Sequence, residues 1–545
     1  MNKTNRASRL YLVKGLVIGF VAVSALLFLR TLSTGSAKDK TSTDQPKYSD
    51  VSNAKRDSTS LDDLAKRINA LIEESQFAYA RWGVSVISAS DGTTIYQRNA
   101  GNLFTPASNM KIYTTGVALD VLGADYRWRT SVYANGQPDA NGTVSGDLIL
   151  YGRGAPDLVS ASRDEHAGSL GKLAGDLYAR GIRKVTGNVI GDESYFRGNA
   201  WGDGWQWTDM QWYFGAEASA LSINGNEIDL NVIPSSTRKE QPTIRISDNQ
   251  GYVTVQNQLV TADLGVRPTI GVHRGLSDNS VQVWGEFAPG SKGFGARLSV
   301  HRPALWAAKL FLDVLKTRGI AVEGQSVVRD SRMPASQRFQ PSQAVELAYV
   351  TSEPLGEITK RTNKESVNLN AELTLRTLGR ERGQSAIHAE PVGRELGDDE
   401  AGLAVIKFWM ARAGISTEHI ALHDGSGLSR LDLVTPESTT RLLVALSKTP
   451  AYQAFRQSLP ISGKDGTLAG RLKSLVDRVE AKTGSLTYDN SLSGYLTNAK
   501  GETFAFSVMC NDQTGRANSI QLIDKIVALV AAFPDLPSKT SGQTP

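Results

Sequence analysis

Three short polar motifs constrain this chain more than any other feature, because they can act together only if the fold brings distant segments to one place. In chain order they are Ser108-Asn109-Met110-Lys111, Ser366-Val367-Asn368 and Lys482-Thr483-Gly484. Each motif alone is common in a chain of 545 residues, but this set in this order is hard to obtain by accident. More than 250 residues separate the first two motifs, far more than a helix and a loop need. We therefore predict a separate structure inserted between them.

The N-terminal segment departs most from ordinary composition. Residues 1–14 carry four basic side chains and no acidic one, and residues 15–29 form an uninterrupted apolar run. Because this run is shorter than the roughly 20 residues that span a bilayer, and small residues at 35–37 suit cleavage, we predict an export signal in residues 1–37. The basic residues beside the run also suit a short retained membrane anchor, so membrane attachment stays open. A polar linker follows at residues 38–59.

The formal net charge of +5 belongs to this export segment. Residues 1–37 contain five Lys or Arg and no Asp or Glu, which leaves 55 basic and 55 acidic residues in the body. This balance gives no reason to expect nucleic acid as a partner. The single cysteine, Cys510, excludes an intramolecular disulfide, and its apolar neighbours predict a buried position in a strand.

Hydrophobic patterns at the two ends of the body predict an α/β (α+β) domain. A helix with a capping pattern at Ser60 comes first, and Asp91-Gly92 predicts a hairpin. Near the C-terminus we expect a strand that carries the third motif, a second hairpin at 491–509, and an amphipathic helix beginning near Ile520. The first and last helices are then expected to pack together on one antiparallel sheet.

The segment between the first two motifs is predicted to be mostly β. Its expected strands lie at residues 144–150, 184–190, 243–246, 252–255 and 280–283, and a helix is expected at 304–316. A cluster formed by Trp201, Trp205, Trp207 and Trp212 is expected to pack locally rather than to stack on sugars. The predicted domains are a catalytic domain (60–127 and 345–535), an insert (128–344) with a nested domain at roughly 235–297, and a polar tail (536–545).

The first motif has the chemistry of a nucleophile and a base. Ser108 precedes an apolar helical stretch that continues to Leu122, so Ser108 and Lys111 share one face. A lysine amine accepts a proton only when neutral, so burial and a nearby cation, Lys482, must lower its pKa by about three units from ~10.4. Taken alone, the pair also fits a helix cap and a solvated lysine. The apolar residues that follow favour a buried, functional lysine.

The other two motifs offer groups for proton relay and peptide binding. Ser366 and Asn368 precede a helical run, where the serine can relay a proton and the amide can bind a peptide, or where both can simply cap the helix. Lys482-Thr483-Gly484-Ser485 fits a strand that presents a cation and hydroxyls to a substrate carboxylate, although an exposed edge strand is the alternative. Backbone N–H groups of Ser108 and Ser485 can form an oxyanion hole.

With the motifs placed, the chain resembles the low-molecular-mass class C penicillin-binding proteins, the S13 family of D-Ala-D-Ala carboxypeptidases and endopeptidases. The resemblance covers nearly the whole body. Beyond the three motifs it rests on residues 146–150 (GDLIL), 185–192 (VTGNVIGD), 219–222 (SALS) and 424–430 (DGSGLSR) with 434–436 (VTP). Two residues depart from the family pattern: Val367 stands where Asp is usual, and Ser485 where Thr is usual.

The resemblance implies a transpeptidase/β-lactamase-like domain whose antiparallel sheet is flanked by helices and which is split by the mostly β insert with its nested domain. It implies that Ser108 is acylated by peptidoglycan stem peptides at the penultimate D-Ala and by β-lactams, in the periplasm or cell envelope. It also implies that Ser426, Leu428 and Arg430 line the pocket. We expect no cofactor and no metal. Carboxypeptidase and endopeptidase activity both stay open, as does the oligomeric state.

Other classes of protein fit the sequence less well. A class A β-lactamase needs a deacylating Glu in an E-x-x-L-N run, which does not follow Asn368, and an α/β-hydrolase needs a G-x-S-x-G that the chain lacks. His419 and His423 have helical metal-ligand spacing but lack the H-E-x-x-H glutamate. A catalytically silent wall-binding protein of the same fold remains an alternative, against which the intact motifs count.

Overall fold

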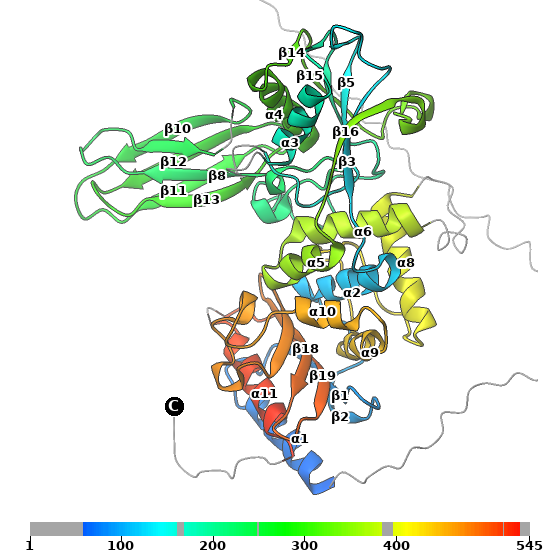
Figure 1. The fold of residues 1–545 in the computed structure, drawn as a ribbon. Coiled ribbons are helices and arrows are strands. Elements are labelled where there is room, and N and C mark those ends of the chain that lie inside the picture. Colours follow the sequence, from blue (N-terminus) through cyan, green and yellow to red (C-terminus); the bar gives the residue numbers. More distant parts are fainter. Residues whose placement is uncertain (1–57, 161–167, 248–249, 384–395, 516, 535–545) are drawn as a thin grey trace, which may run out of the picture. The chain divides into compact units, whose positions relative to one another are not determined.

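The computed structural model describes residues 58–160, 168–247, 250–383, 396–515 and 517–534 (Figure 1). The predicted export segment, nearly all of the linker and the polar tail lie outside these residues. The described residues form one compact unit. Within the described ranges, every helix is too short or too polar to cross a membrane.

A five-stranded antiparallel sheet forms the centre of the part that carries the three motifs. Its strand order is β17-β18-β19-β1-β2, so the last three strands of the chain precede the first two across the sheet. The strands are β1 (Arg81–Ser88), β2 (Thr94–Arg98), β17 (Val479–Leu486), β18 (Asp489–Thr497) and β19 (Thr503–Asn511). Both predicted hairpins are present, and β17, which holds the third motif, is an edge strand.

Alternating residues of β19 show how the two faces of this sheet are covered. Phe506 and Val508 pack with the first and last helices, whereas Ala505 and Met509 pack into a second core with the other helices. The first face carries α1 (Ser58–Glu73) and α11 (Ile520–Ala532), which contact each other as predicted. The second core includes residues of α2 (Met110–Leu122), α5 (Leu355–Lys364), α6 (Asn368–Arg382), α8 (Asp398–Arg412), α9 (Pro436–Leu446) and α10 (Tyr452–Ser458).

The segment between the first two motifs forms four further sheets. The five-stranded one has the order β15-β7-β5-β3-β16. Its strands are β3 (Arg129–Ala134), β5 (Leu148–Tyr151), β7 (Val189–Asp192), β15 (Ser326–Arg329) and β16 (Val345–Thr351). A small parallel sheet joins β4 (Thr143–Val144), β6 (Lys184–Val185) and β14 (Ala321–Val322). Among the described residues of the predicted insert (128–344), the α-helices are α3 (Ser169–Ala179) and α4 (Pro303–Thr317).

Two three-stranded sheets lie together in the green part of Figure 1. One contains β8 (Glu227–Ile233), β9 (Thr243–Ile246) and β13 (Phe294–Ser299); the other contains β10 (Thr254–Thr261), β11 (Thr269–Arg274) and β12 (Ser280–Phe287). The limits of the predicted domains stay a prediction. One strand assigned to the catalytic segment, β16, pairs with β3 of the insert.

Several local expectations differ from the structure. Ser60 lies inside α1, which begins at Ser58, and its hydroxyl donates to the Pro534 carbonyl instead of capping the helix. The expected strands at 144–150 and 184–190 are each broken into two short strands in different sheets. Gly146 sits at the first break with φ of 92°, a backbone conformation that favours glycine. The helix α3 was not predicted.

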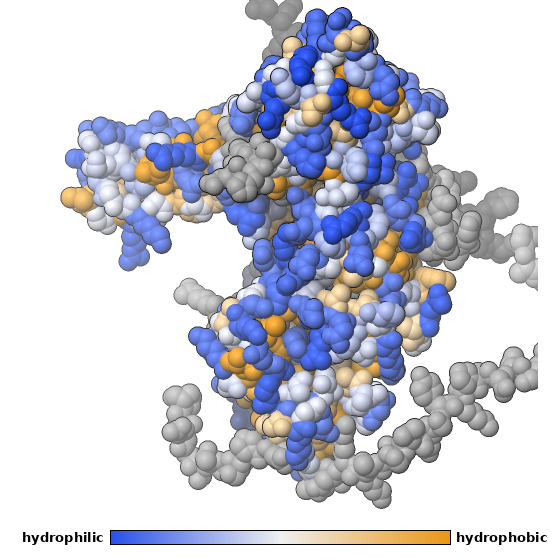
Figure 2. Space-filling model, viewed as in Figure 1, coloured by the Kyte–Doolittle hydropathy of each residue, from blue (hydrophilic) through white to orange (hydrophobic). Residues whose placement is uncertain are grey.

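The tryptophan cluster is spread over different environments. Trp205 is buried and its indole N–H donates to the Asp424 carboxylate over 2.9 Å, whereas Trp207 is 65% exposed. Trp212 forms an isolated β-bridge with Leu298 and packs against the core of the insert. The face of the molecule seen in Figure 2 is mainly hydrophilic, with hydrophobic side chains in smaller patches. Cys510 is buried in β19, as predicted.

Candidate active site

The first motif stands where a short turn of 3-10 helix, Ala107–Asn109, leads into α2. Its helix is buried on all sides over residues 110–119, because it crosses the second core beneath the sheet. Ser108 is partly exposed, whereas Lys111 is completely buried. Burial of the lysine excludes the alternative of a solvated side chain.

Lys111 has three hydrogen-bond partners, and their chemistry fixes what its amine can do. Nζ lies 2.9 Å from Ser108 Oγ, 2.6 Å from Asn368 Oδ1 and 2.6 Å from the Ser426 carbonyl oxygen. A neutral amine has two N–H groups and one lone pair, and two of these partners can only accept. The lone pair of neutral Lys111 must therefore face the Ser108 hydroxyl, which is the geometry of a general base beside its nucleophile.

Both lysines of the site have lowered pKa values. Burial lowers the pKa of Lys111 to about 7, against the opposing effect of the carboxyl groups of Asp424, Glu372 and Asp432. Burial, and then the nearby charge of Lys111, lowers the pKa of Lys482 well below its usual range. The sequence predicted that burial and the charge of Lys482 together lower the pKa of Lys111. In the structure burial lowers this pKa, and the charge effect between the two lysines acts on the pKa of Lys482.

The second motif lies between α5 and α6 and contacts both lysines. Ser366 adopts a left-handed φ of 60° between the helices, and its Oγ accepts a hydrogen bond of 2.9 Å from Lys482 Nζ. Asn368 is the first residue of α6, and its Nδ2 donates to the Phe214 carbonyl over 2.9 Å. This second contact orients the amide so that its oxygen faces Lys111. Neither side chain caps α6.

The third motif brings strand β17 against the turn that holds Ser108. A Cβ on Gly484 would lie 2.6 Å from the Pro106 carbonyl oxygen and 3.1 Å from the Ser108 nitrogen, so only glycine allows this approach. Lys482 is buried on the same face as Gly484, and its Nζ also donates to the Thr483 carbonyl over 2.8 Å. Thr483 is partly exposed and Ser485 is exposed, as the predicted alternation requires.

The loop of residues 424–430 packs against the serine turn and contributes a backbone carbonyl to the site. The Ser426 carbonyl reaches Lys111, and a Cβ on Gly427 would lie 1.8 Å from the Ala107 carbonyl oxygen, which packs the loop against the serine turn. Leu428 is buried. Arg430 instead pairs with Asp489 at 2.8 Å, at the start of β18. Among the described hydrogen bonds, the side chains of Arg430 and Ser485 make none with Ser108 or the two lysines.

The sequence motifs assigned no role to three residues that orient Asn368 and the loop of residues 424–430. Glu372 accepts two backbone N–H groups of the loop, Asp424 accepts those of Gly427 and Ser429, and Phe214 binds Asn368. Asp424 was noted as part of a family marker without a role. Glu372 follows Asn368 by one helical turn, which is the one signal that could have indicated it.

The comparisons with known proteins agree with this geometry. Residues 64–533 match the sequence profile of the D-Ala-D-Ala carboxypeptidase 3 (S13) family. The chain belongs to this family. It is a serine-type D-Ala-D-Ala carboxypeptidase of the penicillin-binding protein 4 kind, and as a cell-wall peptidase it is an exported protein.

Relatives in this family cover most of the chain. The D-alanyl-D-alanine carboxypeptidase of Actinomadura sp. (strain R39) is 32% identical over 500 residues, which are 90% of this chain and 87% of the relative. The D-alanyl-D-alanine carboxypeptidase DacB of Haemophilus influenzae is 29% identical over 422 residues, 76% of this chain and 81% of the relative. The crystal structure of penicillin binding protein 4 from the same organism superposes with a TM-score of 0.72 at 26% identity, covering 85% of this chain and 98% of that one. The expected fold class, family and enzyme activity are thereby confirmed.

Proposed function

We propose that Ser108 is the nucleophile and Lys111 the general base of the acylation step. The observation that carries this assignment is the set of three partners around the buried Lys111 amine, which leaves its lone pair for the Ser108 hydroxyl. Ser108 Oγ attacks the carbonyl carbon of the penultimate D-Ala while Lys111 Nζ takes the hydroxyl proton. The N–H groups of Ser108 and Ser485 stabilise the resulting oxyanion.

Collapse of the tetrahedral intermediate requires a proton for the departing amine. The Ser366 hydroxyl, which accepts a hydrogen bond from Lys482, supplies this proton and is reprotonated through the same contact. The C–N bond breaks, terminal D-Ala leaves, and Ser108 carries the acyl group as an ester. The proton that Lys111 took from Ser108 then passes by way of water to the neutral Lys482 amine, so that Lys111 is again a base. Water attacks the ester, Lys111 takes a proton from this water and returns it to Ser108 Oγ as the ester bond breaks, and the shortened stem peptide leaves.

The edge strand β17 is the proposed binding surface for the peptide. Thr483 and Ser485 alternate away from buried Lys482 and offer hydroxyl groups to the terminal carboxylate. Asn368 binds an amide of the stem peptide, and Ser426, Leu428 and Arg430 line the pocket behind it. The peptidoglycan stem peptide is the substrate, and the periplasm or cell envelope is the site of action.

β-Lactams are proposed to acylate Ser108 and to leave slowly. A solved structure of penicillin binding protein 4 from Haemophilus influenzae is a complex with a β-lactam, which supports this for a related fold. The test is labelling of the protein lacking residues 1–37 with a fluorescent penicillin, beside Ser108→Ala. We expect the wild type to label and the variant not to label. Equal labelling of both proteins would overturn the assignment.

Two activities are compatible with this chemistry, because the departing amine can be free D-Ala or a cross-linking residue. Release of D-Ala from a muropeptide pentapeptide reports carboxypeptidase activity, and cleavage of cross-linked dimers reports endopeptidase activity. A catalytically silent wall-binding protein would do neither. The same Ser108→Ala variant is the control for both reactions.

A further inference from the structure

We propose that Glu372, held by Arg376, is a positioning residue for the general base. In this inference Glu372 fixes the loop of residues 424–429 so that the Ser426 carbonyl accepts a hydrogen bond from Lys111 and directs its lone pair to Ser108. The inference rests on the assignment of Lys111 as general base in the proposed function.

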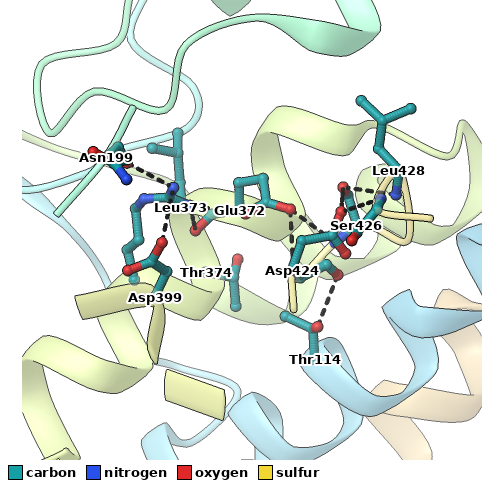
Figure 3. A network of polar contacts seen from close by, with 12 residues as sticks. Thr114, Asn199, Glu372, Leu373, Thr374, Asp399, Asp424, Ser426 and Leu428 are labelled. Carbon is teal, nitrogen blue, oxygen red and sulfur yellow. Dashed lines mark hydrogen bonds and ion pairs between the residues drawn. The ribbon is translucent and has the colours of Figure 1, made fainter. Parts of the chain in front are cut away.

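The contacts form a continuous path from the carboxylate to the lysine amine. One oxygen of Glu372, Oε1, accepts the N–H groups of Gly425 and Ser426, both over 2.9 Å. The carbonyl of Ser426 then accepts the Lys111 amine over 2.6 Å. Glu372 therefore binds the N–H group of Ser426, and the carbonyl group of Ser426 binds Lys111. Figure 3 shows Glu372 reaching from α6 toward the loop that carries Asp424 and Ser426.

The charge and burial of the Glu372 carboxylate indicate a positioning role. Oε2 of Glu372 accepts Arg376 over 2.8 Å, and each of the two side chains is only 1% exposed. Burial and then the nearby Asp424 carboxylate raise the pKa of Glu372, but all of its named partners are N–H donors, which fit its ionised form. Arg376 is itself held by the Asn199 carbonyl at 3.0 Å and by Asp399 at 3.6 Å. A buried ion pair is costly to desolvate, so fully satisfied contacts around it point to a positional role.

One face of α6 positions both the Asn368 oxygen and the Ser426 carbonyl, the two groups that accept hydrogen bonds from Lys111. Asn368 and Glu372 are four residues apart on α6, so they lie on the same side of that helix. Asn368 binds Lys111 directly, whereas Glu372 acts through Ser426. From the opposite side, the Thr114 hydroxyl of α2 donates to the Gly425 carbonyl over 2.8 Å. The loop is thus held between α2, which carries Lys111, and α6, which carries Asn368 and Glu372.

The test measures the second-order rate constant for acylation of Ser108 by a fluorescent penicillin at pH values from 5 to 9, together with melting temperature. In Glu372→Ala the loop loses its clamp, and we expect acylation to slow about 100-fold. Glu372→Gln keeps an oxygen for the two N–H groups, so we expect it to lose less activity than the alanine variant.

A second readout separates positioning from mere support of the fold. The carboxyl groups of Asp424, Glu372 and Asp432 favour the charged form of Lys111, so replacing Glu372 by a neutral amide moves the acidic limb of the pH–rate profile to lower pH. In Glu372→Gln the NH2 group of the new amide would face the N–H groups of Arg376, which are also donors. The double variant Glu372→Gln with Arg376→Gln replaces this contact by a pair of amides that can hydrogen-bond. If the single variant does not fold, we expect the double variant to show the same shift of the pH–rate profile. Asp192→Asn is the control: it disrupts the ion pair of buried Asp192 with partly exposed Arg329 in the insert, and we expect it to leave the rate and its pH midpoint unchanged.

The outcomes are distinct from those that test the proposed function. Labelling that persists in Ser108→Ala removes the proposed function itself. If the wild type labels through Ser108 but folded Glu372→Ala acylates at the wild-type rate, the inference on Glu372 is wrong while the function stands. A pH midpoint in the folded glutamine variants identical to that of the wild type, with an unchanged rate, also overturns it.

Discussion

At the scale of single residues, the proposed mechanism makes activity depend on the protonation state of Lys111. The charged amine donates to Ser108 and cannot take its proton, whereas the neutral amine turns its lone pair to that hydroxyl. Burial places the pKa of Lys111 at about 7. We therefore expect the rate constant for acylation of Ser108 to rise with pH through a midpoint of about 7, measured with a fluorescent penicillin across a pH series.

Lys111→Arg is the matched variant for this prediction. A guanidinium stays protonated at every pH used, so we expect acylation to fall by at least about 100-fold and to lose its acidic limb. A wild-type rate that is flat from pH 5 to pH 8 would contradict the assignment of Lys111 as base.

The proposed nucleophile and base could be picked out from the sequence because each stands within a short motif. Ser108 and Lys111 are three residues apart, and an apolar helix follows them at once. The residues that orient Ser108 and Lys111 do not stand within a recognisable motif. Glu372 lies 53 and 54 residues from its loop partners, and Phe214 lies 154 residues from Asn368, so only the folded chain brings them together.

At the scale of elements, the approach of β17 to the serine turn depends on one missing side chain. In Gly484→Ala the new Cβ would lie 2.2 Å from Ser491 Oγ and 2.6 Å from the Pro106 carbonyl, so strand or turn must move. We expect the variant to lose about 1–3 kcal/mol of stability and to acylate about 100-fold more slowly, since Ser108 is displaced from the N–H group of Ser485. Thermal unfolding and penicillin labelling measure the two effects.

Gly136→Ala is the control for this substitution, because nothing lies within 4 Å of its added Cβ. We expect its melting temperature and labelling rate to match the wild type. A Gly484→Ala protein that labels as fast as this control would show that close packing of β17 on the serine turn is dispensable.

The elements that could be predicted are those whose pattern is local. The hairpins and end helices of the central sheet follow from turn residues and apolar periodicity. In the insert, two continuous β patterns are divided between sheets, because the chain turns at Gly146 and because Gly187 packs against it, where a Cβ would lie 2.6 Å from the Gly146 carbonyl oxygen. Which sheet each half joins depends on partners far along the chain.

At the scale of the whole molecule, the insert contributes to the site through residues 210–214. The carbonyl of Phe214 orients Asn368, which in turn binds Lys111. The start of this segment is held by buried Arg274 of β11, whose Nη2 donates to the Met210 carbonyl over 2.8 Å. The inserted sheets are therefore connected to the base by a short series of contacts.

This connection predicts that a substitution in β11 slows the chemistry. Arg274→Met removes the buried donor of the Asp278 carbonyl and leaves the Met210 carbonyl with the Ser299 hydroxyl alone, and we expect a loss of about 3 kcal/mol in stability. Acylation of Ser108 is expected to slow about tenfold, because the segment that orients Asn368 is loosened rather than removed. Exposed Arg267 provides the control Arg267→Met, which is expected to change neither quantity. Penicillin labelling is compared at a temperature where all three proteins are folded. If Arg274→Met then labels as fast as Arg267→Met, the inserted sheets stabilise the chain without tuning its active site.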